Sequence, residues 1–237
     1  MAKHPIQKTG HLKAYLSKES GLRASVLDLT PMVSQLCDHL QTSPSSAVAL
    51  GRLLVGSVLV ASQLKEDQAI SFQVSGRESI KKIFAHAQYD GLCRAYIDEK
   101  QAPLSVKNNN LSLEAVIGGG QLQANLYGPK SEKPHTTHLQ LVNGEIGEDL
   151  AYYLNQSCQI PCLLSLALKI GKESQVLKAG GVLIELMPGH TEKTLQVLEA
   201  QQEKAQPLSQ MMENTGDFEA WLQNYLGPLK AKEIRSH

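Results

Sequence analysis

One nearly uninterrupted apolar stretch, AVALGRLLVGSVLVA from Ala47 to Ala61, places the strongest constraint on how this chain can fold. A membrane-spanning helix needs about 20 apolar residues, and a central arginine costs it roughly 2.5–3.5 kcal/mol. Arg52 lies inside the stretch, and Ser57 and two glycines interrupt it. We therefore expect no membrane span, but a helix from Pro44 to about Leu64 that other elements bury on nearly all sides.

Two proline-containing pairs predict where helices begin. Thr30-Pro31 and Ser43-Pro44 each place a capping hydroxyl before a proline at the first helical position. The first of these helices would bury one face, because apolar residues recur at helical spacing through Val33, Leu36, Cys37 and Leu40.

The middle of the chain changes to the period of two that is typical of strands. Ile70, Phe72 and Val74 alternate with polar residues, and Asp90-Gly91 is a strong hairpin signal. Further strands are expected around residues 122–126, 137–141, 164–170 and 179–187, with Gly118–Gly120 as a turn or bulge. A phosphate loop is the alternative for these glycines, but it needs a helix directly after them.

A helix that carries Ile146, Leu150, Tyr153 and Leu154 on its apolar face interrupts the strands. The order is therefore helices, many strands at hairpin spacing, one inserted helix, more strands and a helical tail. This order predicts an α+β fold, with a largely antiparallel sheet packed with helices and followed by a helical linker arm.

From Thr191 onward the pattern is that of two or three amphipathic helices. Its apolar contacts are Leu195, Leu198, Met211, Met212, Phe218, Trp221, Leu222, Tyr225 and Leu226. The change near Pro188 predicts a core domain over residues 1–188 and a helical arm over residues 189–237.

Charge and the N-terminal sequence limit the partners and the compartment. Lys and Arg together number 23, as do Asp and Glu, so no net field attracts nucleic acid or acidic membranes. The first 16 residues contain no apolar block of the kind a secretory signal needs. We expect a cytoplasmic protein that binds neither nucleic acid nor membrane.

Two of the four cysteines, Cys158 and Cys162, lie four positions apart across Pro161. A disulfide needs Cβ atoms about 3.5–4.5 Å apart, whereas an extended segment would separate them by roughly 13 Å. A tight turn at Pro161 could still bring the sulfurs together. The sequence favours two ordinary thiols at a helix–strand junction, and a redox pair is the alternative.

Neither a metal site nor an active site can be assembled from the sequence. A structural zinc ion needs four ligands, and His135 and His138 would lie on opposite faces of a strand. There is no visible nucleophile with its base and no arranged pair of carboxylates. We therefore predict that the chain is not an enzyme.

The chain contains four distinctive blocks: ALGRLLVGSVLVASQLK (residues 49–65), GLCRAYI (91–97), GEIGEDLAYYLNQS (144–157) with QIP after it, and AGGVLIELMPG (179–189). Together they resemble the signature blocks of heat shock protein 33. They occur in the order and spacing of this family of redox-regulated holdase chaperones of bacteria. The resemblance extends over nearly the whole chain.

The resemblance implies a cytosolic, ATP-independent chaperone that binds unfolding proteins under oxidative or heat stress and prevents their aggregation. It also implies a homodimer with an α+β core, a helical linker and a zinc-bearing C-terminal module. The linker would correspond to roughly Thr191–Gly227, so its apolar residues named above are the candidates for client binding.

The chain departs from the family at three points. The family's zinc ligands, a Cys-x-Cys and a later Cys-x-x-Cys, are absent, so we expect no cofactor here and either a shortened version of a longer protein or a natural short form. The family usually has a glutamate at Cys158 and a glutamine at Glu185. Cys158 and Cys162 are thus not its redox cysteines, and a thiol-based redox enzyme or sensor that uses them is the alternative function.

Overall fold

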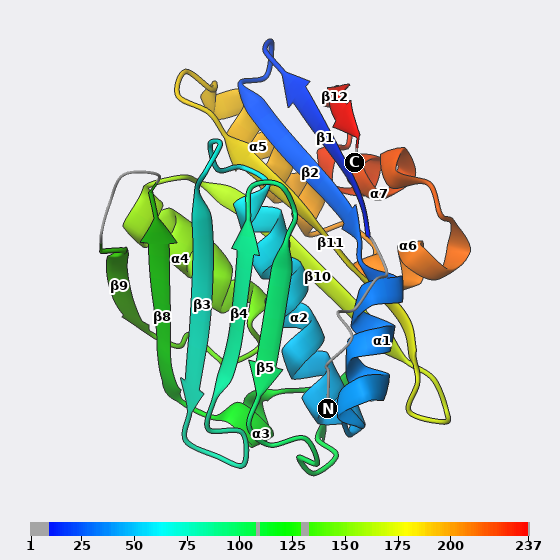
Figure 1. Cartoon of the computed structure of the whole chain (residues 1–237). Helices are drawn as coiled ribbons and strands as arrows, with labels where there is room; N and C mark the ends of the chain where they lie inside the picture. The colour runs from blue at the N-terminus through cyan, green and yellow to red at the C-terminus, as the bar shows by residue number, and fades with distance from the viewer. Residues whose placement is uncertain (1–9, 108–109, 129–132, 237) are drawn as a thin grey trace.

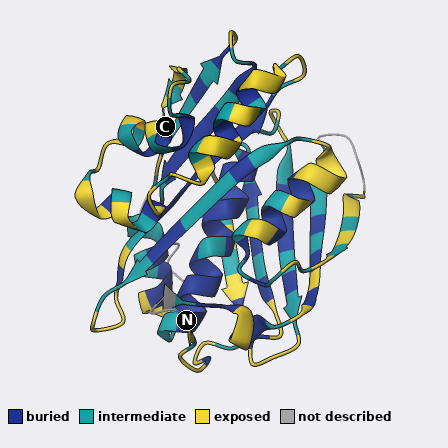
Figure 2. Ribbon diagram, turned by 180° about the vertical axis from the view of Figure 1, so that it is seen from behind, coloured by how far each residue is buried: buried dark blue, intermediate teal, exposed yellow. Residues whose placement is uncertain are grey.

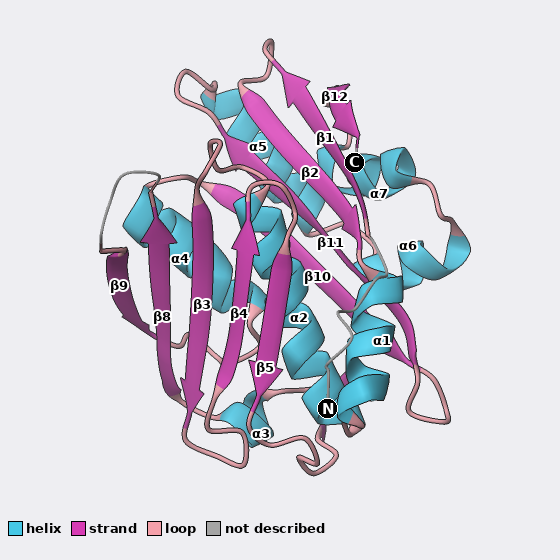
Figure 3. Cartoon of the chain, viewed as in Figure 1, coloured by secondary structure: helices cyan, strands magenta, loops and turns pink. Residues whose placement is uncertain are grey.

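The computed structural model describes residues 10–107, 110–128 and 133–236. Two antiparallel sheets enclose a layer of helices, and further helices cover the far side of one sheet (Figures 1 and 3). The predicted α+β class is confirmed, and the described strands form two five-stranded sheets and the small two-stranded sheet β6-β7. The elements are, in order, β1 (His11–Ser17), β2 (Leu22–Asp28), α1 (Thr30–Leu40), α2 (Pro44–Ala61), β3 (Ala69–Gly76), β4 (Ile83–Gln88), β5 (Cys93–Ile97), β6 (Val106–Lys107), β7 (Asn110–Leu111), α3 (Glu114–Ile117), β8 (Gly120–Tyr127), β9 (His135–Gln140), α4 (Gly147–Cys158), β10 (Cys162–Ile170), β11 (Val176–Leu186), α5 (Glu192–Gln202), α6 (Leu208–Asn214), α7 (Phe218–Leu226) and β12 (Lys232–Ser236).

The two large sheets each have five strands. The first sheet has the order β10-β11-β2-β1-β12, and the second sheet has the order β5-β4-β3-β8-β9. Every pairing among the described residues is antiparallel. The predicted hairpin at Asp90-Gly91 joins β4 to β5, and Gly91 has the positive φ of 90° that such a turn requires.

Helix α2 lies between the sheets at the centre of the molecule, as predicted (Figure 2). It is long and apolar enough to cross a membrane, but 89% of it is buried inside the protein. Arg52 can lie within it because Nη1 donates a 2.6 Å hydrogen bond to Oε2 of Glu145. The helix is therefore the core element of the fold.

The two predicted helix caps differ in outcome. The hydroxyl of Ser43 accepts a hydrogen bond from Ser46 N, as a capping side chain does. The prediction for Thr30 is wrong, because Leu29 occupies the cap position and no side chain caps α1. Thr30 Oγ1 instead accepts a 2.9 Å hydrogen bond from Ala179 N, which joins α1 to β11.

Several elements were not predicted. Strands β1 and β2 form two neighbouring positions of the first sheet, and α3 directly precedes the glycine run. The end of the arm is strand β12, not a helix, and it pairs with β1 along the sheet edge. The arm is thus joined to the first sheet at both ends, through β11 and through β12.

Strand β11 is covered on both faces. We call the face of the first sheet toward α2 its inner face and the face toward α5–α7 its outer face. Leu183 packs in the cluster on the inner face, and Val182 packs in the cluster on the outer face. Two adjacent glycines permit close packing here: a Cβ on Gly180 would lie 2.7 Å from Cε of Met212, and one on Gly181 would lie 2.7 Å from a methyl of Leu59.

Candidate functional site

The arm helices bury a continuous apolar face against the outer face of the first sheet (Figure 2). On the sheet, this contact is made by Tyr15, Leu22, Ala24, Val26, Leu163, Ala167, Val182, Ile184 and Leu186. On the arm, Leu198, Met212, Trp221, Leu222, Tyr225 and Leu226 are buried, and Leu195, Met211 and Phe218 are half-buried at the margin. The structure therefore brings all nine sequence-predicted arm residues together in one cluster.

Trp221 is the centre of this cluster. It is completely buried, its ring stacks on Phe218 with centroids 5.0 Å apart, and its indole N–H donates a 2.9 Å hydrogen bond to the carbonyl oxygen of Thr215. An indole with a satisfied N–H can be buried without a polar penalty. Trp221 is therefore the largest apolar contribution of the arm to its own docking.

Among the described residues, few side-chain polar contacts join the arm to the body of the protein. The hydroxyls of Tyr225 and Ser165 lie 2.7 Å apart, and Lys169 pairs with Glu213. From β12, Glu233 pairs with Lys13 of β1 at 2.9 Å, and Nη2 of Arg235 donates to the carbonyl oxygen of Ser62. Surface ion pairs of this kind are worth about 0–1 kcal/mol, so apolar burial of α5–α7 and the backbone pairing of β12 with β1 hold the arm in place.

The arm helices are short, at 11, 7 and 9 residues for α5, α6 and α7. Isolated helices below about 12–15 residues are marginal in water, so these helices depend on their contact with the sheet. Because β11 and β12 hold both ends, the apolar face can be uncovered either by lifting α5–α7 between these strands or by unpairing β12. The arrangement is thus an apolar face of the first sheet that is covered by three short helices.

Sequence reasoning missed Leu208, which is buried in the same cluster. Its spacing of three and four from Met211 and Met212 is the signal that could have found it. It also missed that the sheet supplies the other half of the surface. The run Val182-Leu183-Ile184, apolar at consecutive positions, is typical of a strand covered on both faces.

The two cysteines lie where the sequence placed them, at a helix–strand junction. Cys158 ends α4 and Cys162 begins β10, and both are free thiols. Burial, reinforced by the charge of Glu185, raises the pKa of Cys162 to about 12. Cys158 is exposed as a residue, but partial burial of its sulfur also raises its pKa, although a hydrogen bond with Tyr153 opposes this. Such thiols are poor nucleophiles near neutral pH.

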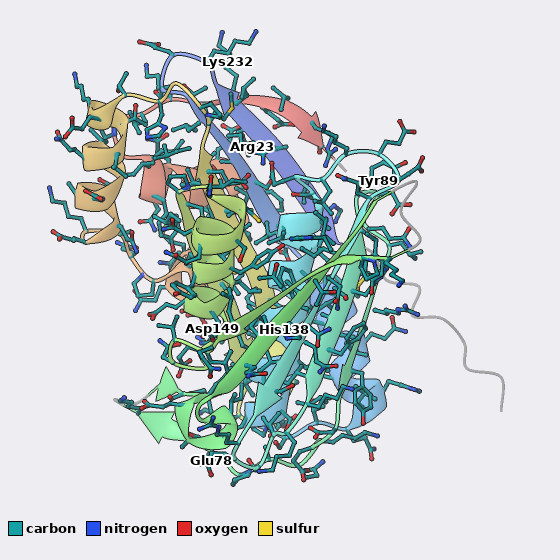
Figure 4. All side chains as sticks on the ribbon, turned by 90° about the vertical axis from the view of Figure 1, so that its left-hand side faces the viewer. Arg23, Glu78, Tyr89, His138, Asp149 and Lys232 are labelled. Atoms are coloured by element: carbon teal, nitrogen blue, oxygen red, sulfur yellow. The ribbon has the colours of Figure 1, made fainter. Side chains whose placement is uncertain are left out.

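Glu185 is an acid buried beside these thiols on the inner face. It pairs with Cys162 in the β10–β11 register and with Arg23 in the β11–β2 register, and Arg23 Nε donates to its Oε2 at 2.6 Å. Burial raises the pKa of Glu185, although Arg23 acts in the opposite direction. Figure 4 shows Asp149 at one end of α4 and Arg23 beyond the other, where the helix ends at Cys158.

The zinc ion that the resemblance implies does not fit these residues. The described part of the chain contains no group of three or more His, Cys, Asp or Glu side chains that could hold a metal ion. Cys37 is buried in the main core cluster and Cys93 is half-buried against it.

Comparison with known proteins identifies the family to which this arrangement belongs. The family model described as Hsp33 protein matches residues 10–236. The chain belongs to the Hsp33 family. Its fold is similar to the crystal structure of a 33 kDa chaperonin, a heat shock protein 33 homolog, from Thermotoga maritima, with a TM-score of 0.86 and 22% identity over 94% of this chain and 78% of that one.

Curated Hsp33 relatives show the same relationship at the level of sequence. A 33 kDa chaperonin of Desulfotalea psychrophila is 36% identical over 73% of this chain, and one of Streptococcus thermophilus is 31% identical over 92% of it. A 33 kDa chaperonin of Syntrophotalea carbinolica is 29% identical over 85%. The matched stretch spans 58%, 76% and 70% of these relatives' own lengths, respectively.

Proposed function

We propose that this Hsp33 protein is an ATP-independent holdase chaperone, which binds unfolding proteins and prevents their aggregation. Family membership and the name of its relatives, 33 kDa chaperonin, support a chaperone role and no enzymatic one. The single observation that carries the proposal is the covered apolar cluster between α5–α7 and the first sheet.

A holdase requires apolar surface that is covered at rest and uncovered under stress, because a permanently exposed patch of several hundred Å² promotes self-association. The cluster meets the first condition, since Trp221, Met212 and Leu226 are almost fully buried. It meets the second because short helices that depend on docking are the first elements to detach when the protein is heated. Both the arm and the uncovered outer face of the first sheet would then bind apolar segments of clients.

Heat or oxidative damage to clients would supply the stress, but no oxidant is needed to open this arm. The described residues hold no zinc ligand set, and the thiols beside α4 have raised pKa values. We therefore propose client binding by the reduced protein. A thiol-based redox enzyme or sensor at Cys158 and Cys162 is less well supported, because it requires a lowered thiol pKa.

Light scattering by a client enzyme that aggregates on heating tests the proposal. Reduced protein at several-fold excess should suppress the scattering as the temperature rises, with no effect of added ATP. The same experiment below the temperature at which the arm opens should show little suppression. Absence of suppression at every temperature would refute the holdase function for this chain.

The proposal includes a cytoplasmic homodimer that binds neither nucleic acid nor membranes, in keeping with the family resemblance. It also includes the division into a core over residues 1–188 and an arm over residues 189–237. Size-exclusion chromatography with light scattering would measure the mass in solution. Limited proteolysis near Pro188 and Gly189 would test whether the arm detaches as a unit.

A further inference from the structure

A cavity of about 410 Å³ lies on the inner side of the molecule, away from the client surface. It is half open to solvent and is lined by residues of β1, β2, α1, the end of α2, the β4–β5 turn and Arg235 of β12. Its volume falls within the range of about 300–1,000 Å³ that is usual for small-molecule sites. In Figure 4, Tyr89, one of its lining residues, lies at the turn end of the second sheet, close to β12.

The floor of this cavity is apolar. It is formed by Leu12, Leu27, Leu29, Met32 and Val58. Four of these are buried in the main core cluster, and Met32 is half-buried against it. A ligand that enters must therefore present an apolar body to these side chains.

The rim of the cavity carries a cation with unused hydrogen-bonding capacity. Nη2 of Arg235 donates to the carbonyl oxygen of Ser62 at 3.3 Å, but its Nε is buried and has no hydrogen-bond partner. None of the ion pairs made by the described residues includes Arg235. Because Nε is shielded from solvent, a ligand in the cavity would meet this guanidinium through its Nη groups, and an anionic ligand would supply the counter-charge that Arg235 lacks among the described residues.

The acidic residue among those that line the cavity does not fill this role. Asp90 Oδ1 accepts a hydrogen bond from Leu92 N within its own hairpin turn. The guanidinium of Arg235 is a planar fork that matches a carboxylate. An apolar floor with an unpaired arginine at the rim complements a molecule with a hydrocarbon body and one carboxylate end.

We propose that this cavity binds a small amphipathic carboxylate, with its chain on Leu27, Met32 and Val58 and its carboxylate on Arg235. Because Arg235 belongs to β12, such a ligand joins the end of the arm to the body. A ligand that binds only the docked arrangement stabilises it. Provided that the arm acts as the proposed function requires, the ligand therefore delays client binding.

Isothermal titration calorimetry of the full reduced chain with sodium octanoate tests the site, with octan-1-ol and octylamine as probes of the same chain length. Octanoate should bind saturably and about tenfold more tightly than the alcohol, which corresponds to one charge-assisted contact. Arg235→Gln should remove this preference. The matched control is Lys232→Gln, an exposed cation on the same strand that does not line the cavity.

A second variant, Met32→Trp, should fill the cavity and weaken all three probes, with circular dichroism to establish that it folds. Octanoate should also slow hydrogen exchange in residues 232–236. No saturable binding, equal binding of octanoate and octanol, or equal effects of Arg235→Gln and Lys232→Gln would each overturn the proposal. If octanoate binds as expected without delaying client protection, the site stands and the coupling to the arm is wrong.

Discussion

The hydroxyl of Tyr225 in α7 lies 2.7 Å from the hydroxyl of Ser165 in β10, inside an interface that is otherwise apolar. Tyr225 is buried and Ser165 is half-buried, so this polar pair joins α7 to the sheet within the apolar contact. Burial raises the pKa of Tyr225, although the hydrogen bond to Ser165 opposes the shift. The phenol therefore stays neutral throughout the physiological range.

Replacement of this hydroxyl should weaken arm docking slightly. Tyr225→Phe removes one hydrogen bond but keeps the ring, so we expect the free energy of unfolding to fall by about 0.5–1.5 kcal/mol. Urea denaturation followed by Trp221 fluorescence would measure it. Tyr152→Phe, at an exposed position of α4, is the control and should change little. An equal loss in both variants would contradict the assigned contact.

Truncation of Trp221 should uncover the arm. Trp221→Ala removes a fully buried ring, and such changes typically cost about 3–5 kcal/mol. Because α7 depends on docking, we expect faster hydrogen exchange in residues 192–226, stronger binding of an apolar dye, and client protection at a lower temperature. Gln202→Ala, exposed on α5, should leave all three unchanged. Unaltered exchange in the tryptophan variant would show that the arm does not depend on this residue.

The sequence predicted those parts of the fold whose signals are local. Helix α2 is apolar all round, and the β4–β5 hairpin is fixed by Asp90-Gly91, so both were found. Strands β1 and β2 were missed because both of their faces are partly covered, and β1 shifts register against β12 between Ala14 and Tyr15. Such strands lack the clean alternation that marks a half-exposed sheet.

Only the arm side of the candidate site was predicted from the sequence. The nine arm residues follow helical spacing and could be read from the chain, but the sheet surface that receives them is assembled from β1, β2, β10 and β11. Only long-range pairing brings these strands together. Strand β12 was missed for a similar reason, since Lys232–Ser236 is largely exposed and acquires its structure from the edge of β1.

The Arg52–Glu145 pair should be essential to the core. Glu145 also accepts hydrogen bonds from Ser112 Oγ at 2.6 Å and from Leu113 N at 2.9 Å. Glu145→Ala leaves these donors and Arg52 without their acceptor, so we expect a loss of about 2–4 kcal/mol in the free energy of unfolding. Glu114→Ala, which removes the exposed pair with Lys107, should cost at most about 1 kcal/mol.

The same carboxylate gives a defined response to acid. Burial alone would raise the pKa of Glu145, but hydrogen bonds from Ser112 and Leu113 and the charge of Arg52 outweigh it and lower the pKa. The stability it contributes is thus present above its ordinary pKa and is lost as the pH falls through the lowered value. The difference between wild type and Glu145→Ala should therefore shrink in acid, as measured by urea denaturation from pH 7 to pH 3.

Glu185 should show the opposite dependence on pH. Because burial raises its pKa above the ordinary value of 4.5, its contribution is fully present below that value and is lost as the pH rises through the raised one. Relative to Glu185→Gln, wild type should therefore lose stability between about pH 4.5 and neutrality. Glu173→Gln, in an exposed turn, is the control. A constant difference across this range would show that Glu185 does not titrate within it.

The thiols at the α4–β10 junction should react slowly while the protein is folded. Burial raises the pKa of Cys158 and raises that of Cys162 to about 12, so the thiolate fraction of each is lowered, most strongly at Cys162. Mass spectrometry after brief exposure to iodoacetamide should find the half-buried Cys162 largely unmodified and the exposed Cys158 modified more slowly than glutathione, whereas both should react fully in urea.

A variant with both cysteines replaced by serine separates the chaperone from the redox hypothesis. If the arm alone controls client binding, the double variant should suppress client aggregation as well as wild type does, with or without peroxide, since neither thiol contacts the arm cluster. Thermal denaturation would show that the variant folds. Peroxide-dependent activation in wild type that disappears in the double variant would instead assign the control to Cys158 and Cys162, and the raised pKa values would not describe the reactive state.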